Sequence, residues 1–210
     1  MGIHVHDVKQ WLLHANTRIQ EEKAYLTALD QAVGDGDHGI NLARGFLEVA
    51  LKLEKTTYPD IGSLLQDAGM VLLSKVGGAS GPLLGTAFMK AAIVCKGKTE
   101  MSTTDLGAAL QEAVKGIKLR GKAEVGNKTM LDVWEPVAQY VQEHAEQLSW
   151  FELNDFARLR MEMTKEMEAK KGRAAYLGPR SVGHLDPGSV STYFLMKALC
   201  TTMNRSEEHK

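Results

Sequence analysis

Apolar residues recur at helical spacing along most of the chain. Between Val5 and Leu29 they follow one another at intervals of three or four residues, which places them on one helix face, with Glu22 as the only interruption. Similar stripes predict further helices over about residues 41–54, 60–75 and 80–96, and helices that begin near residues 104, 129, 149 and 186. No alternating run bounded by turn residues predicts a strand. We therefore expect an all-α fold, a bundle of about eight antiparallel amphipathic helices, in one domain over residues 1–210.

The helix starts and inward faces can be predicted residue by residue. Three starts carry N-cap patterns: Thr129 with Asp132, Ser149 with Glu152, and Asp186 followed by Pro187. The expected inward residues of the second helix are Ala43, Phe46, Leu47, Ala50 and Leu53. Those of the helix that starts near residue 149 are Phe156, Leu159, Met163 and Met167.

The connections between these helices fall into two chemical groups. If consecutive helices are antiparallel, alternate connections lie at the same end of the bundle. The segments near residues 55–59, 97–103 and 146–148 are chemically plain, whereas segments 33–39, 77–82, 120–128 and 171–188 are rich in glycine, acids, bases and hydroxyls. We expect these four polar segments to converge at one end and to form a site.

Composition narrows the class of protein. The chain has 210 residues, 44% of them hydrophobic, and its 25 basic and 26 acidic residues give a formal charge of -1. This balance excludes extensive disorder and provides no global positive charge for direct nucleic-acid binding. The longest stretch without a charged residue, 76–89, is too short and too rich in glycine to span a membrane. With no secretory signal and two cysteines, Cys95 and Cys200, in apolar runs, we expect a cytoplasmic protein with reduced core thiols.

Three carboxylates gather in the first polar segment. Asp35 and Asp37 are separated by one glycine, and Asp30 closes the preceding helix. Oxygen-only clusters of this kind suit hard cations, and Mg²⁺ commonly takes a few carboxylates together with phosphate oxygens and water. A calcium-binding EF-hand does not fit, because Ile40 and Phe46 stand where that loop needs glycine and glutamate.

The other polar segments add groups that bind phosphate. Segment 77–82 opens a helix, and backbone amides at a helix start bind anions. Arg173 and Arg180 can grip phosphate oxygens, whereas Lys122 and Lys128 are each expected to be solvated. Residues 116–123 nearly match a P-loop but lack its Ser or Thr and the strand before it, so we reject that interpretation. With no evident nucleophile, this equipment favours phosphoryl transfer.

Taken in order, these segments resemble a known family. The motifs are Asp30, GDGDHGIN at 34–41, GGASGP at 77–82, RGKAE at 120–124, KTM at 128–130, KGRA at 171–174 and GHLDPG at 183–188. They resemble the nucleotide-binding L subunit of dihydroxyacetone kinase over essentially the whole chain. The resemblance implies a barrel of eight antiparallel amphipathic helices, with the nucleotide in the loops at one end. One departure is Asn127, where relatives often carry aspartate, and we assign it no metal or acid-base role.

The resemblance also implies roles for individual residues. Asp30, Asp35 and Asp37 would hold two Mg²⁺ ions that bridge the phosphates of ADP or ATP. The nucleotide would be lined by His38, Gly39, Ile40, Asn41, Ala79, Ser80, Gly121, Met130, Arg173, Asp186, Pro187 and Gly188. Ser80 and Arg173 would act in catalysis by stabilising charge on the moving phosphoryl group.

Two branches of the family use the nucleotide differently. In one, ATP exchanges and the nucleotide domain is fused to the sugar-binding domain; in the other, bound ADP is rephosphorylated by a phosphohistidine protein of the phosphotransferase system, fed by phosphoenolpyruvate. Because 210 residues are used by the helical domain, we expect dihydroxyacetone to be held by a separate K subunit, which favours the second branch. The alternatives are an ATP-exchanging subunit of a ketose kinase, a non-catalytic nucleotide-sensing adaptor and a purely structural bundle. A homodimer is one possible assembly of the chain.

Overall fold

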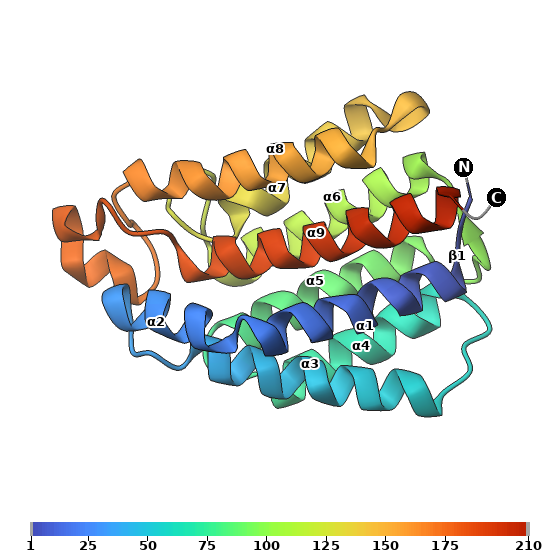
Figure 1. The fold of residues 1–210 in the computed structure, drawn as a ribbon, viewed down its shortest axis with the longest axis horizontal. Coiled ribbons are helices and arrows are strands. Elements are labelled where there is room, and N and C mark those ends of the chain that lie inside the picture. Colours follow the sequence, from blue (N-terminus) through green and yellow to red (C-terminus); the bar gives the residue numbers. More distant parts are fainter. Residues whose placement is uncertain (1, 209–210) are drawn as a thin grey trace.

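The computed structural model describes residues 2–208 and is almost entirely helical (Figure 1). Its α-helices are α1 (Val5–Glu21), α2 (Lys23–Val33), α3 (His38–Lys55), α4 (Ile61–Lys75), α5 (Ser80–Val94), α6 (Thr103–Gly121), α7 (Leu131–Glu143), α8 (Trp150–Met163) and α9 (Pro187–Glu208). Short 3₁₀ segments are η1 (Ala145–Gln147), η2 (Thr164–Glu166) and η3 (Arg173–Ser181), and two strands are β1 (Ile3–His4) and β2 (Glu100–Met101). The predicted all-α class is confirmed.

The helices pack in sequence order into a closed ring. Each helix from α3 to α9 contacts the next one, and α1 closes the ring by contacting both α3 and α9. Figure 1 shows the long helices lying side by side with alternating direction, so that alternate connections share an end. This arrangement is a barrel of antiparallel helices whose apolar stripes all face one interior.

The first predicted helix is divided. The stripe from Val5 to Leu29 predicted one helix, but the structure ends α1 at Glu21 and begins α2 at Lys23. Glu22 lies between them, with its amide still bonded to the Arg18 carbonyl and its carboxylate 2.9 Å from the Arg18 guanidinium. The break is therefore a local kink, and α1 with α2 occupies one place in the ring.

A small sheet was not predicted. Strands β1 and β2 pair antiparallel, with Ile3 opposite Met101 and His4 opposite Glu100. Two residues per strand are too few to produce an alternating sequence pattern, so periodicity could not reveal this ladder. It lies beside the N-terminus, at the end of the barrel opposite the loop between α2 and α3 (Figure 1).

The core follows the predicted stripes with two corrections. On α3, four of the five residues expected inside are buried, but Leu47 is 44% exposed. On α8 the inward face consists of Trp150, Leu153, Ala157 and Met161. Leu159 and Met163, which share the competing stripe, are exposed. A helix can turn only one stripe to the barrel, and on α8 the stripe that includes the bulky tryptophan occupies the interior.

Helix caps largely match the sequence patterns. The Ser149 side chain accepts the Glu152 amide, and the Asp186 carboxylate accepts the Ser189 amide at 2.7 Å. The pattern at Thr129 acts differently, because Asp132 accepts the Thr129 amide but the helix itself begins at Leu131. Such side-chain acceptors satisfy amides that a helix start leaves without partners.

The two cysteines lie in the apolar interior of the barrel. Cys95 and Cys200 are buried and free, as predicted for core thiols, and burial raises the pKa of each. Within residues 2–208, no helix combines the length and apolar character that a bilayer crossing requires.

Candidate functional site

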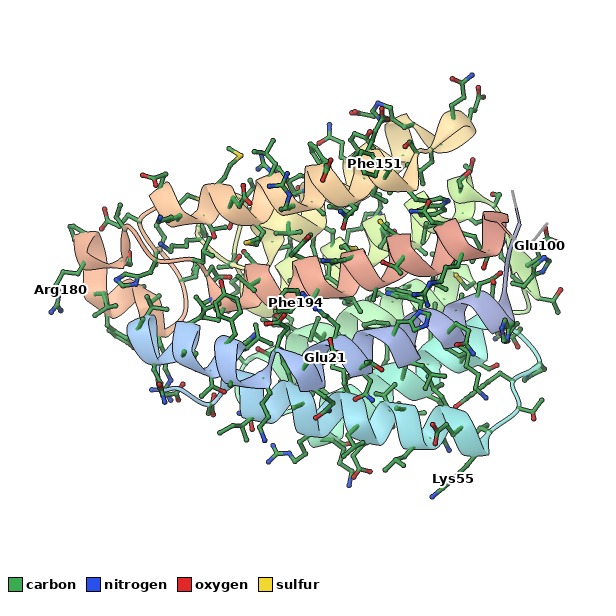
Figure 2. All side chains as sticks on the ribbon, in the orientation of Figure 1. Glu21, Lys55, Glu100, Phe151, Arg180 and Phe194 are labelled. Atoms are coloured by element: carbon green, nitrogen blue, oxygen red, sulfur yellow. The ribbon has the colours of Figure 1, made fainter. Side chains whose placement is uncertain are left out.

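A cavity of about 430 Å³ opens at one end of the barrel, a volume typical of small-ligand sites. Arg180, labelled in Figure 2, marks this end of the molecule. Its lining comes from all four polar connections: Asp30, Val33, Gly34, Asp35, Asp37, His38, Gly77, Gly78, Ala79, Ser80, Leu83, Lys128, Thr129, Met130, Lys171, Gly172, Arg173, Ala174, Asp186, Pro187 and Gly188. The predicted convergence of these segments is confirmed.

The three aspartates form one cluster on the cavity wall. Ligand oxygens of Asp30, Asp35 and Asp37 all lie within 4.8 Å of one another. Asp30 is oriented from behind, because one of its carboxylate oxygens accepts the amides of Asp37 and His38 at 2.9 and 3.1 Å. A side chain on Gly34 would collide with the other oxygen of Asp30, so glycine is required there. Three carboxylates so close together repel, and a divalent cation with oxygen ligands fits them.

Arg173, at the start of η3, reaches this cluster. Its Nε lies 2.8 Å from the Asp35 carboxylate, while its side chain is 68% exposed. An exposed ion pair stabilises a protein by at most about 1 kcal/mol. The contact therefore orients the guanidinium but contributes little to the free energy of folding. The two terminal nitrogens of Arg173 remain able to hold phosphate oxygens.

Three helix starts point at the same cavity. Helix α3 begins at His38, α5 at Ser80 and α9 at Pro187, and all three residues line it. The helix dipole makes each start favourable for negative charge, and at α3 and α9 the carboxylates of Asp30 and Asp186 already accept start amides. The tight turn before α5 depends on Gly81, whose place a Cβ could not share with the Val76 carbonyl. The cavity therefore brings a cluster of three carboxylates, which suits a cation, next to three helix starts, which favour anions.

Ser80 belongs to a hydrogen-bonded chain with His38 and Ser191. Ser80 Oγ lies 3.1 Å from His38 Nδ1, and His38 Nε2 lies 3.0 Å from Ser191 Oγ. Ser191 donates its own hydrogen to the Gly188 carbonyl, so we infer that His38 Nε2 carries the proton and Nδ1 accepts from Ser80. Burial lowers the pKa of His38, against the raising effect of Asp30, and this favours the neutral ring. The lone pairs of Ser80 are thus left to face the cavity.

Asp186 forms the wall next to α9. Its carboxylate caps that helix, and Lys128 and Asp132 are the charged groups nearest to it. Burial raises the pKa of Asp186 to about 7, with Asp132 adding to the effect and the Ser189 amide and Lys128 opposing it. Asp186 therefore caps α9, as predicted, and also lines the cavity.

Four residues expected to line a nucleotide are not among the residues that line this cavity. Gly39 is buried where a Cβ would meet the Lys23 carbonyl, and Ile40 is 47% exposed. Asn41 is next to Gly77, and Gly121 is next to the side chain of Leu83, and both of these neighbours line the cavity. The other residues expected to line the nucleotide do line the cavity: His38, Ala79, Ser80, Met130, Arg173, Asp186, Pro187 and Gly188.

The lining also contains residues that were not predicted to line a nucleotide. Val33, Leu83 and Ala174 add apolar surface beside Met130, and Thr129 adds polar surface. Val33 and Ala174 belong to a small separate apolar cluster completed by Ala169. In the sequence, the only signal for these residues was their place inside the motifs, for Thr129 and Ala174, or beside them, for Val33 and Leu83.

Lys128 corrects a second sequence prediction. Its side chain was expected in solvent, yet it is only 1% exposed. Its Nζ donates to the carbonyls of Met167 and Ser181, at 2.9 and 2.5 Å, and these carbonyls flank the segment that carries Arg173. Burial lowers the pKa of Lys128, while the negative charges of Asp186 and Glu166 oppose this effect. Lys128 therefore holds both ends of the segment that carries Arg173, through its hydrogen bonds to Met167 and Ser181.

Replacing Lys128 by methionine is expected to destabilise the protein by about 2–4 kcal/mol, because two buried carbonyls lose their donor. The Arg173 segment should also exchange its amide hydrogens faster than the helices of the ring. Chemical denaturation and hydrogen exchange measure the two effects. The control is Lys122→Met, at an exposed lysine of the same connection, which should stay within about 0.5 kcal/mol of the parent protein. Equal stability of both variants would contradict this role of Lys128.

Comparison with known proteins identifies the family. Residues 32–201 match the DAK2 domain. The chain belongs to the DAK2 domain family. The DAK2 chain is 44% identical over 193 residues to the ADP-binding subunit DhaL of PEP-dependent dihydroxyacetone kinase 1 from Listeria innocua, covering 92% of this chain and 94% of that protein. It is 40% identical over 190 residues to the ADP-binding subunit DhaL of PTS-dependent dihydroxyacetone kinase from Lactococcus lactis, covering 90% and 93%.

A solved structure shares the fold of this DAK2 chain. The dihydroxyacetone kinase from C. freundii, crystallised in complex with AMP-PNP and Mg²⁺, matches with a TM-score of 0.72 at 24% sequence identity. The match covers 92% of this chain but 33% of that longer one. The likeness supports the barrel architecture found here.

Proposed function

We propose that this chain is the ADP-binding subunit of a phosphoenolpyruvate-dependent dihydroxyacetone kinase. A phosphoryl group would pass from a phosphohistidine protein of the phosphotransferase system to bound ADP, and from there to dihydroxyacetone on a separate K subunit, giving dihydroxyacetone phosphate. The names of the two similar subunits support the donor branch. The structural observation that most supports this function is the cavity, which is lined by three carboxylates, three helix starts and Arg173. The closed ring of helices supports one nucleotide-binding domain over residues 1–210.

The residues present fit a Mg²⁺-nucleotide. Asp30, Asp35 and Asp37 offer only oxygen ligands, which Mg²⁺ prefers, and we propose that they hold two ions. Bound Mg²⁺ would neutralise phosphate charge and hold the phosphates for in-line transfer. The helix start at Ser80 would bind phosphate oxygens through its amides.

The protein's own groups would then stabilise the moving charge. Arg173 is placed to hold the equatorial oxygens of the transferred group, because its Nε is anchored on Asp35 and its terminal nitrogens are free of that ion pair. The Ser80 hydroxyl donates its hydrogen to His38, so we propose that its lone pairs accept hydrogen bonds from groups in the cavity and orient them. The base for the sugar hydroxyl would belong to the K subunit.

A reconstituted assay tests this proposal. The chain would be combined with a K subunit, a phosphohistidine donor and phosphoenolpyruvate, and formation of dihydroxyacetone phosphate would be followed. We expect turnover with ADP present in amounts equal to the chain and no need for added ATP. Turnover that requires free, exchanging ATP would replace the donor branch by an ATP-dependent ketose kinase. Tight ADP binding with no transfer to any ketose would indicate a nucleotide-sensing adaptor.

A further inference from the structure

A second polar groove lies on the side of the barrel, between α1 and α9. Figure 1 shows these two helices antiparallel and side by side, and they are in contact. The groove has a volume of about 320 Å³ and is lined by His14, Thr17, Arg18, Glu21, Lys197, Ala198, Thr201 and Arg205. Glu21 and Phe194, labelled in Figure 2, mark the face on which it opens. No residue of this groove lines the cavity at the barrel end.

Positive charge is concentrated there. Arg18, Lys197 and Arg205 line the groove together with one acid, Glu21, although the whole chain carries a net charge of only -1. Arg18 is paired with Glu21 and Glu22, so the excess positive charge comes from Lys197 and Arg205. Among the described residues, no carboxylate forms an ion pair with Lys197 or Arg205. Two cations that line one concave surface, neither of them in an ion pair with a described carboxylate, attract anions more strongly than scattered surface charges.

The groove is also held in place by its surroundings. The Arg18 guanidinium lies 5.3 Å above the Phe194 ring and contacts Glu22 at 2.9 Å. Lys197 Nζ lies 6.0 Å from the Tyr193 ring centre. Because aromatic rings and an acid anchor these side chains, less conformational entropy remains to be lost when a ligand binds.

His14 forms part of the wall and provides a reporter. Its Nδ1 lies 2.8 Å from Thr202 Oγ1, which donates its own hydrogen to the Ala198 carbonyl. We infer that Nδ1 carries the ring proton, so that Nε2 is the nitrogen left to titrate. Burial lowers the pKa of His14, and the positive charge of Arg205 lowers it further.

We propose that this groove binds a small multivalent anion of the phosphate-ester class, at a site distinct from the cavity at the barrel end. Lys197 and Arg205 would bind the phosphate oxygens, and the hydroxyls of Thr17 and Thr201 would complete the contacts. Lys197 follows Gly188 by nine residues on α9, so the two sites are separated by roughly 14 Å along the helix axis. The inference does not depend on the proposed kinase function.

Titration with glycerol 3-phosphate, without Mg²⁺ or nucleotide, tests this site. The imidazole signals of His14 would be followed by NMR in the full-length protein. A bound dianion offsets Arg205 and favours the charged ring, so the pKa of His14 is expected to rise. The charged groups that line the groove around His14 are Arg18 and Glu21 on α1, and Lys197 and Arg205 on α9.

Matched variants decide whether the groove is responsible. The double variant Lys197→Gln, Arg205→Gln should bind glycerol 3-phosphate at least about tenfold more weakly, since each lost charge-assisted hydrogen bond costs more than 1 kcal/mol. Lys115→Gln, at an exposed lysine on α6, should bind like the parent protein. Unfolding curves would establish that both variants fold. An unresponsive His14 signal, or an equal affinity of the double variant and the parent, would overturn the proposal.

Discussion

Replacing Arg173 by alanine is expected to slow phosphoryl transfer about 10³-fold while changing ADP affinity by less than about tenfold. The guanidinium would stabilise charge that develops on the transferred group, and that charge is absent from bound ADP. Among residues 2–208, the ion pair found for this side chain joins its Nε to Asp35, and the side chain is 68% exposed. Its removal should therefore leave the fold intact. Single-turnover transfer in the reconstituted system, together with equilibrium ADP binding, measures the two effects.

Two further variants sharpen this test. Arg173→Lys keeps the charge but loses the planar two-pronged geometry, so we expect it to restore only part of the rate. Arg180→Ala removes an exposed arginine of the same η3 segment that, unlike Arg173, does not line the cavity, and it should transfer at the parent rate. If Arg173→Ala lost ADP affinity and transfer rate to the same degree, its role would be binding of the ground state, and the catalytic assignment would be wrong.

Replacing Asp37 by asparagine is expected to weaken Mg²⁺-dependent ADP binding by about 100-fold or more, because a charged metal ligand is lost. Asp37 gives the cleanest test of the three acids. Asp30 also orders the loop by accepting two amides, and Asp35 also anchors Arg173. Within residues 2–208, the structure shows no hydrogen bond or ion pair that the Asp37 carboxylate makes to a protein group.

Stability measurements separate this metal role from a structural one. Without ligand, Asp37→Asn should unfold at the parent temperature or above it, since one repelling charge is gone. With Mg²⁺ and ADP, the parent protein should gain stability and the variant should not, and a chelator should abolish the gain in the parent. Asp155→Asn, at an exposed acid paired with Arg158 on α8, is the matched control. An unchanged ligand-induced gain in Asp37→Asn would exclude this carboxylate as a ligand.

Several features of the site could be predicted because they depend on local sequence. The aspartates are two or a few residues apart, so their proximity hardly depends on the fold. Helix starts at Ser80 and Pro187 follow from glycine, serine and aspartate at the N-terminal positions. Antiparallel packing of consecutive helices then brought the polar connections together, as the cavity shows.

Other features depended on packing that no local pattern encodes. Lys128 lies in a polar connection, and its burial is fixed by two carbonyls located 39 and 53 residues further along the chain. The His38 tautomer depends on Ser191, which is 153 residues away. On α8 two apolar stripes competed, and only the position of the neighbouring helices determined which one was buried.

The helical class, the family and the group of acids could be derived without coordinates, because they follow from periodicity and from motifs of adjacent residues. Three features became known from the folded arrangement: the burial of Lys128, the absence of Gly39, Ile40, Asn41 and Gly121 from the cavity lining, and the groove shared by cations of α1 and α9. Burial and hydrogen-bond partners are properties of groups distant in sequence, and they are set when the ring of helices closes.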